Sequence, residues 1–568
     1  MSLVSSARFK VTKLLKKFTT KDGLVGDYDY LYLFTPKIPF FSKDKIQPFF
    51  PLDAEMPVFL GFLLGLQHAL AMLAGVVSPP LLISSAANLD TETTQFLVSC
   101  SLITSGILSA IQITRFRIYG TPYSIGTGLL CVVGTSFTTI SIVSKAFPIM
   151  YKDGTCPVSE DGTKLPCKDG YGMVLGTTCC CALLEIAGSF LPPKLLQKVF
   201  PPIVTGPVVL LIGVSLIQSG FNDLVGGSGC VGEVCPSATA PIPLTWGSAQ
   251  FIGLGFLVWM VIVICEKWGA PIMKSMAVIC GLLVGCIVAA ACGYFDRSGI
   301  DIAPAATFLW VHTFRLRVYG PIVLPLLALF IVLMMEAIGD ITATSDVSRL
   351  PVEGPEYESR IQGGILADGL SGILSPLFGC TPMSTFAQNN GVISITKCAS
   401  RTVGYWCCFF LIIMGIFSKF AAAIVSIPKA VLGGMTTFLF TSVACSGLAI
   451  ISGLEFTRRD RFVLTASLMW GFGATLVGDW FDTFFGYKGE NHSLTGLLNA
   501  VILVMETGFA VTGFIAVFLN LLIPQEADED DSEELVSVRS TRSRLVDGTE
   551  VTPKDEFIGE EEKAKESA

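Results

Sequence analysis

Long apolar segments separated by short polar loops fill the chain between residues 55 and 524. A helix of about 20 apolar residues crosses the hydrocarbon core of a bilayer, and repeated runs of this kind are typical of a polytopic membrane protein. The pattern predicts about 14 spans, of which 384–396 is too short for a full crossing. The segments lie at 57–78, 93–113, 121–144, 171–191, 203–218, 250–266, 272–294, 320–340, 361–379, 384–396, 402–425, 430–452, 462–485 and 496–522.

Composition supports a membrane protein, because 51% of the 568 residues are hydrophobic and 15% are charged. Soluble domains carry about a quarter charged residues. The charges crowd into two tails, 1–54 and 525–568, on either side of the predicted transporter domain at 55–524. The first tail is basic and lacks the apolar core of a cleavable signal peptide, so we expect the first span to act as the insertion signal. The second tail is acidic and, by composition, disordered.

Loop charges predict the orientation of the spans. With the N-terminus in the cytosol, short basic loops alternate with outer loops such as 145–170 and 219–247, as the positive-inside rule requires. The loop at 295–319, which carries three arginines, is the exception. An even number of spans then places both termini in the cytosol.

Two pairs of cysteines lie in the predicted outer loops. Cys156 and Cys167 share one loop, and Cys230 and Cys235 share the other. If these loops face outward, disulfides become possible, and the sequence leaves that question open. A metal site is disfavoured, because the pairs lack the Cys-x-x-Cys spacing and accompanying histidines of zinc sites.

The predicted spans divide into two groups of equal size. An odd number of spans in each half forces the halves into opposite orientations, which is the inverted-repeat plan of many secondary transporters. The third segment of each half, 121–144 and 384–396, is interrupted by Gly, Pro or Asn. Irregular spans at matching positions indicate a substrate site near the middle of the membrane.

Ionisable residues within apolar spans are the first candidates for function. Glu336 and Asp340 are four residues apart, so they share one face of a helix. Asp340 has an alternative interpretation as an interfacial residue at the cytosolic end of its span. Asp368, flanked by Gly and Ala, is either a second protonatable site or an acceptor that ties two helices together. His68 is more typical of a hydrogen bond between helices than of a substrate contact.

Carboxamides and aromatic rings supply further candidates. Gln388, Asn389 and Asn390 interrupt an apolar run, and carboxamides both donate and accept hydrogen bonds, as the edges of a planar lactam heterocycle do. The alternative is hydrogen bonding between helices. Phe137, after Ser136, is placed to stack on a flat ring, although most of the 40 Phe residues are expected to face lipid or core.

Enzyme and pump signatures are absent from the sequence. It contains no Walker A motif, no HExxH, and no GxSxG or GxGxxG in a suitable context. We therefore expect a secondary transporter, and neither an enzyme nor an ATP-driven pump.

The run from Gln388 to Lys397, QNNGVISITK, matches every fixed position of the signature of the nucleobase–ascorbate transporter family (nucleobase:cation symporter-2). The pair Gln67-His68 resembles a second family motif. The segments beginning at Glu336 and Glu358 resemble the eighth and ninth spans of fungal uric acid–xanthine permeases. The similarity covers residues 55–524 and leaves the tails out.

This resemblance implies an all-α fold of two inverted seven-span repeats, with short strands in spans 3 and 10. Spans 1–4 and 8–11 would form a core domain, and spans 5–7 and 12–14 a gate domain. The protein would be a plasma-membrane homodimer that carries purine bases, mainly xanthine and uric acid, together with protons by an elevator-like movement. It would need no cofactor or metal apart from the coupling proton, and its partners would be the purine and the bilayer, not nucleic acid.

The resemblance also assigns roles to individual residues. Substrate binding would fall to Gln388, Glu336, Phe137, Ser136 and Asn389. Coupling or architecture would fall to Asp340, Asp368, His68, Asn390 and Thr396. A selectivity gate would be formed by Thr507 and Phe509.

Other functions stay open at this stage. A uracil carrier or an anion carrier would use the same architecture, and a channel would show neither saturation nor proton coupling. A non-transporting sensor would call for a larger soluble domain than these tails provide.

Overall fold

The computed structural model describes residues 19–36, 48–160, 162–235, 242–486 and 492–524. The predicted acidic tail at 525–568 and residues 1–18 of the predicted basic tail lie outside the described residues. In the first half of the chain the elements are α2 (Lys21–Leu24), α3 (Tyr30–Phe34), α4 (Val58–Ala86), α5 (Thr91–Ile113), β1 (Phe116–Arg117), β2 (Ser124–Ile125), β3 (Val133–Thr135), α6 (Phe137–Lys152), α7 (Lys168–Gly188), α8 (Pro193–Val199), α9 (Pro202–Leu224), β4 (Val234–Cys235), β5 (Leu244–Thr245), α10 (Ala249–Trp268), α11 (Pro271–Ser275), α12 (Ala277–Ala291) and α13 (Ser298–Ile302).

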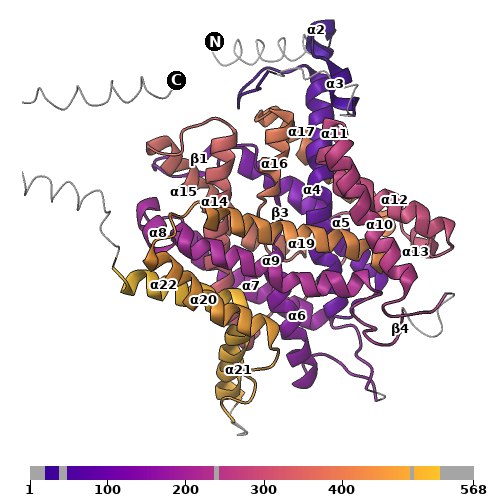
Figure 1. Cartoon of the computed structure of the whole chain (residues 1–568), viewed down its shortest axis with the longest axis vertical. Helices are drawn as coiled ribbons and strands as arrows, with labels where there is room; N and C mark the ends of the chain where they lie inside the picture. Colours follow the sequence, from indigo (N-terminus) through magenta and orange to yellow (C-terminus); the bar gives the residue numbers. More distant parts are fainter. Residues whose placement is uncertain (1–18, 37–47, 161, 236–241, 487–491, 525–568) are drawn as a thin grey trace, which may run out of the picture.

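The second half repeats a similar succession of long helices with one short strand. Its elements are the 3-10 helix η1 (Gly320–Ile322), α14 (Val323–Val347), α15 (Pro355–Phe378), β6 (Met383–Thr385), α16 (Gln388–Thr396), α17 (Arg401–Ile416), α18 (Ser418–Val425), α19 (Lys429–Ser452), α20 (Arg458–Leu476), α21 (His492–Glu506) and α22 (Gly508–Leu522). In Figure 1, α9 and α19 run side by side across the middle of the molecule, and α20, α21 and α22 lie together at its lower left.

Among the described residues, seven helices are long and apolar enough to cross a membrane, and the number rises to nine if each of two bent helix pairs counts as one span. The chain is therefore a mostly helical, multi-pass membrane protein. Most of the predicted apolar segments overlap a single long helix, whereas 272–294, 402–425 and 496–522 each cover two helices and 121–144 covers two short strands and the start of α6. Other predicted spans are not among these helices: α6 and α16 have only 16 and 9 residues, and α20 begins with the four charged residues Arg458–Arg461.

Two short strands lie in the third and tenth segments, where the resemblance places them. β3 and β6 pair antiparallel, with Gly134 opposite Ser384. A Cβ atom on Gly134 would lie 2.3 Å from Cζ of Phe386, so glycine is required for the ring to lie against the strand. The pair joins the two halves of the chain at the centre of the molecule.

Helices α9 and α19 pack at very short range. A Cβ on Gly213 would lie 2.4 Å from the backbone nitrogen of Ala444, and one on Gly447 would lie 2.3 Å from that of Leu210. Small residues let membrane helices approach closely, and such packing is a main source of helix association in lipid. This helix pair is thus built as a tight unit.

Both pairs of loop cysteines are disulfide-bonded, Cys156 to Cys167 and Cys230 to Cys235. The loop before α7 is also tied to the one before α5, because Lys168 forms an ion pair with Asp90 at 2.8 Å. Asp90 in turn caps α5 by accepting a hydrogen bond from the backbone N–H of Thr93.

Some details differ from the sequence prediction. The segment predicted at 320–340 continues as α14 to Val347, so Asp340 lies two turns inside a helix and not at its end. Thr344 and Ser345 lie beyond the predicted end of this segment and are buried against protein. The fold is also not purely α-helical, because β1–β2 and β4–β5 form two further short antiparallel pairs.

Candidate substrate site

A cavity of about 330 Å³ lies between two groups of elements. One wall comes from α14, β6, the start of α16 and the start of α6. The opposite wall comes from α9 and α19. Its lining includes Phe137, Thr138, Thr205, Val209, Ile212, Met335, Glu336, Gly339, Asp340, Ala343, Ser384, Thr385, Phe386, Ala387, Gln388, Asn390, Val443, Ser446, Ala449 and Ile450.

Helix α14 presents its two carboxylates to this cavity. Glu336 and Asp340 are one turn apart, and Gly339 between them leaves open space. The shared helical face predicted from their spacing is confirmed. One turn further on, Thr344 donates a hydrogen bond to Oδ1 of Asn390 at 2.7 Å, which fixes α14 against α16.

The strand pair brings the two broken segments together at the cavity. The backbone N–H of Ser136 donates to the carbonyl of Pro382 at 2.9 Å, and that of Phe386 donates to the carbonyl of Val132 at 2.9 Å. Directly after these bonds α6 begins at Phe137 and α16 begins at Gln388. Helix N-termini carry unpaired N–H groups and partial positive charge, so the cavity offers donors beside the carboxylates of α14.

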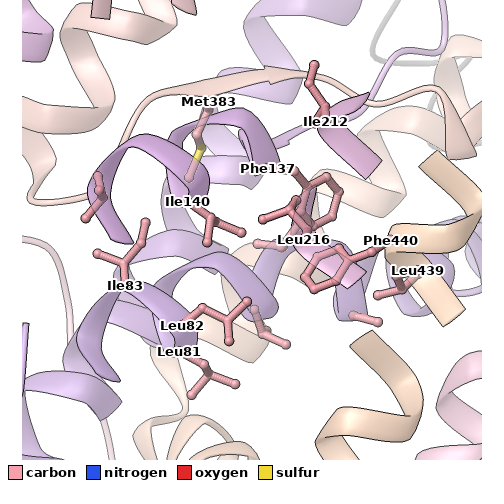
Figure 2. Packing of buried hydrophobic residues seen from close by; sticks show 14 of the residues in the cluster. Leu81, Leu82, Ile83, Phe137, Ile140, Ile212, Leu216, Met383, Leu439 and Phe440 are labelled. Atoms are coloured by element: carbon pink, nitrogen blue, oxygen red, sulfur yellow. The ribbon is translucent and has the colours of Figure 1, made fainter. Parts of the chain in front are cut away.

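Aromatic rings close one side of the cavity. Phe137 stacks on Phe386 with centroids 5.7 Å apart and planes 7° from parallel, and it meets the edge of Phe440 of α19. Figure 2 shows Phe137 beside Phe440, with Ile212 and Leu216 of α9 next to them. A flat apolar face thus lies beside polar groups, which suits a planar heterocycle.

Asn389 points away from the cavity. Its Oδ1 lies 2.8 Å from Nδ1 of His68, and its Nδ2 donates to the carbonyl of Leu130. Both side chains are fully buried. This arrangement ties α4 and α16 to the segment before β3, which is the helix-linking role predicted for His68; direct substrate contact by Asn389 stays a prediction.

Asp368 of α15 lies behind the cavity wall. Its Oδ1 accepts a hydrogen bond from the hydroxyl of Thr385 at 3.1 Å, and Thr385 itself lines the cavity. Thr385 also receives a hydrogen bond from Nε2 of Gln112 at 3.1 Å. The structure therefore connects Asp368 to the cavity through one side chain.

The remaining predicted residues occupy other positions. Ser136 is buried directly before α6, whereas Thr396, the last residue of α16, donates a hydrogen bond to the carbonyl of Val392. Neither lines the cavity. Sequence reasoning missed Thr385, Phe386 and Gln112, although the first two stand within three residues of Gln388 in the same interrupted segment.

Thr507 and Phe509 border a second cavity of about 250 Å³. Thr507 lies between α21 and α22, at the 83° bend that separates the two helices. Lys145 of α6 also lines this cavity and donates to the backbone carbonyl of Glu506. The predicted gate residues thus lie together at a break in a helix, apart from the first cavity.

Comparisons with known proteins identify the family. Residues 61–479 match the model of the Permease family Xan_ur_permease. The chain is 60% identical to a purine permease and 59% identical to a uric acid–xanthine permease of Emericella nidulans, with 92% of each chain covered in both cases.

The fold of the chain is also similar to that of a solved structure. Murine solute carrier 26 family member A9, an anion transporter in the inward-facing state, superposes with a TM-score of 0.50 at 11% identity, covering 81% of this chain and 72% of that one. Because the family model spans most of the chain and the relatives cover nearly all of it, this protein is a transporter and belongs to the Xan_ur_permease (nucleobase:cation symporter-2) family.

Proposed function

We propose that this protein takes up purine bases, mainly xanthine and uric acid, together with protons across the plasma membrane. The observation that carries this proposal is the cavity in which Gln388 and Glu336 face a stacked aromatic wall. The names of the two fungal relatives supply the substrate class.

In the proposed complex the base lies with its face against Phe137 and its polar edge toward Gln388 and Glu336. Gln388 both donates and accepts, and the Glu336 carboxylate accepts from a ring N–H. A hydrogen bond to a charged group contributes about 1.5–3 kcal/mol. A ring that lacks the matching donor would therefore bind much more weakly.

We further propose the finer architecture that the resemblance implies: about 14 spans in two inverted repeats, with both termini in the cytosol. The antiparallel pairing of β3 with β6, each followed by a short helix, supports such a relation between the halves. The core would comprise spans 1–4 and 8–11, and the gate spans 5–7 and 12–14. The cavity between α14–α16 and α9–α19 would then lie between core and gate, as an elevator-like movement in a homodimer requires.

The test is uptake of radiolabelled xanthine in a host that lacks purine permeases. Glu336→Gln and Gln388→Ala should each raise the KM for xanthine roughly 10- to 150-fold, the equivalent of losing one charge-assisted hydrogen bond. Surface levels should stay normal. Asp346→Asn, an exposed carboxylate on the same helix and outside the cavity lining, is the matched control. Unchanged saturable uptake in both site variants would refute the binding site.

A further inference from the structure

Glu185 lies inside helix α7, and its carboxyl group takes no part in the substrate site described above. Its side chain is 1% exposed and does not line the purine cavity. Neither Oε1 nor Oε2 has a hydrogen-bond partner among the residues that the structure describes. The surrounding sequence, CCCALLEIAG, is otherwise apolar.

Among the described residues, the charged groups of α14 and α15 that act on Glu185 are carboxylates. α7 packs against α14 and α15 so closely that a Cβ on Gly369 would lie 2.9 Å from the backbone nitrogen of Ile186 and 3.3 Å from the carbonyl carbon of Glu185. From α15 the facing charge is that of Asp368, and from α14 it is that of Glu336, both of which interact electrostatically with Glu185. Asp340 is one turn beyond Glu336 on α14.

The described basic residues of α15, α8 and α6 lie away from Glu185, and those of the loop before η1, Arg315 and Arg317, meet α7 through their backbone at Gly172 and Gly176. Arg360 of α15 bonds Glu356 and the carbonyl of Thr127, and Lys194 of α8 pairs with Glu358 at 3.6 Å. From α6, Lys145 donates to the backbone carbonyl of Glu506 and Lys152 lies at the opposite end of that helix.

An ionised carboxylate in such a place is unfavourable, because it has lost water and gained no donor or cation. As the neutral acid, Glu185 has an O–H to donate. Asp368, whose charge acts on Glu185 from α15, has a second oxygen, Oδ2, that is also buried and has no hydrogen-bond partner within the described part of the chain. Two neighbouring buried carboxyl groups of this kind are expected to share one proton.

We propose that Glu185 and Asp368 together form the site that binds the transported proton, separate from the purine cavity. This inference rests on the proposed function. A proton from external water neutralises the pair, moves with the core and leaves to internal water, which restores the carboxylate; no other bond changes. Thr385 links the two sites, because it lines the cavity and donates to Oδ1 of Asp368.

The experiment uses the full-length protein reconstituted in liposomes, with wild type, Glu185→Gln and Glu358→Gln as variants. Glu358→Gln removes one carboxylate from the exposed end of α15, where it pairs with Lys194. Two readouts are taken: xanthine accumulation driven by a proton gradient, and xanthine exchange across the membrane without a gradient. Glu185→Gln should lose accumulation, so that the internal-to-external ratio falls to one, while exchange continues at the wild-type KM.

A third readout does not need purine transport. Infrared spectra of the reconstituted protein at several pH values should show a protonated carboxylic acid band that Glu185→Gln lacks and Glu358→Gln retains. If wild type moves no purine, the proposed function fails while this band still reports on Glu185. Accumulation of wild-type size and pH dependence in Glu185→Gln, or an unchanged band, would overturn the inference.

Discussion

At the scale of single residues, the site divides into groups that face the cavity and groups that hold those in place. Glu336 and Gln388 face it, whereas the buried pair His68 and Asn389 joins α4 to α16. A charged or polar group buried in a membrane protein is tolerated where it is bonded or where it functions. Phe137 belongs to both groups, because it lines the cavity and packs on Phe386.

Replacing Phe137 should separate stacking from packing. Aromatic contacts contribute about 0.5–1.5 kcal/mol beyond buried area, so Phe137→Leu should raise the KM for xanthine about 2- to 10-fold, since about 1.4 kcal/mol corresponds to tenfold. Phe137→Tyr, which keeps the ring, should stay within about twofold of wild type by the same argument. Concentration-dependent uptake at matched surface levels measures this. Equal KM values for the Leu and Tyr variants would contradict the stacking role.

At the scale of elements, the strand pair β3–β6 positions the site. The two strands pair at three positions, which brings together residues more than 240 positions apart in the chain. Each strand leads into a helix that begins at the cavity. Gly134 and Gly75 leave the space in which Phe386 lies. The Phe137 stack depends on this ring, so the strand geometry controls the aromatic wall.

Alanine at Gly134 should disturb that arrangement. Its Cβ would approach Cζ of Phe386 to 2.3 Å, and forcing extra atoms into a packed core costs about 1–3 kcal/mol. We expect a lower thermal unfolding temperature of the purified protein and reduced xanthine uptake. Gly253→Ala on α10 is the control, because no atom lies within 4 Å of the added Cβ. Equal melting temperatures for the two variants would show that the ring is free to move aside.

The sequence predicts most of the helices and several residues of the cavity, and it misses contacts between segments that are distant in the chain. Hydropathy located most of the long helices that the structure describes, because lipid-facing surface must be apolar. It ended α14 too early, since Thr344 and Ser345 are polar but buried against protein. Glu336, Asp340 and Gln388 were predicted to lie together from a helical period and a motif. Thr385 and Gln112 were not, because pairing between distant segments leaves no local pattern.

At the scale of the whole molecule, the cavity is lined by two groups of elements, which we propose above to be core and gate. One contains α14, α16 and the strand pair, and the other contains the tightly packed α9 and α19. Substrate would leave on the inner side when one group moves against the other, which is the movement proposed above. α6 and α9 meet across the same boundary, where the hydroxyls of Ser141 and Ser215 lie 3.1 Å apart.

A cross-link at this contact should stop transport. In Ser141→Cys/Ser215→Cys the two thiols should oxidise to a disulfide that joins α6 to α9. We expect oxidation to abolish xanthine uptake and a reductant to restore it, while each single variant stays active. Continued uptake by protein shown to be cross-linked would exclude movement between these helices.

The central claim is that the protein carries purine bases with protons. The most direct test is uptake of radiolabelled xanthine by the wild-type protein in a permease-null host, with unlabelled uric acid, uracil and other bases as competitors and with the proton gradient intact or collapsed. We predict saturable xanthine uptake that uric acid inhibits and uracil does not. Uptake should be lost when the proton gradient is collapsed and should persist when sodium is replaced. Uptake blocked by uracil, or unaffected by loss of the proton gradient, would contradict the claim.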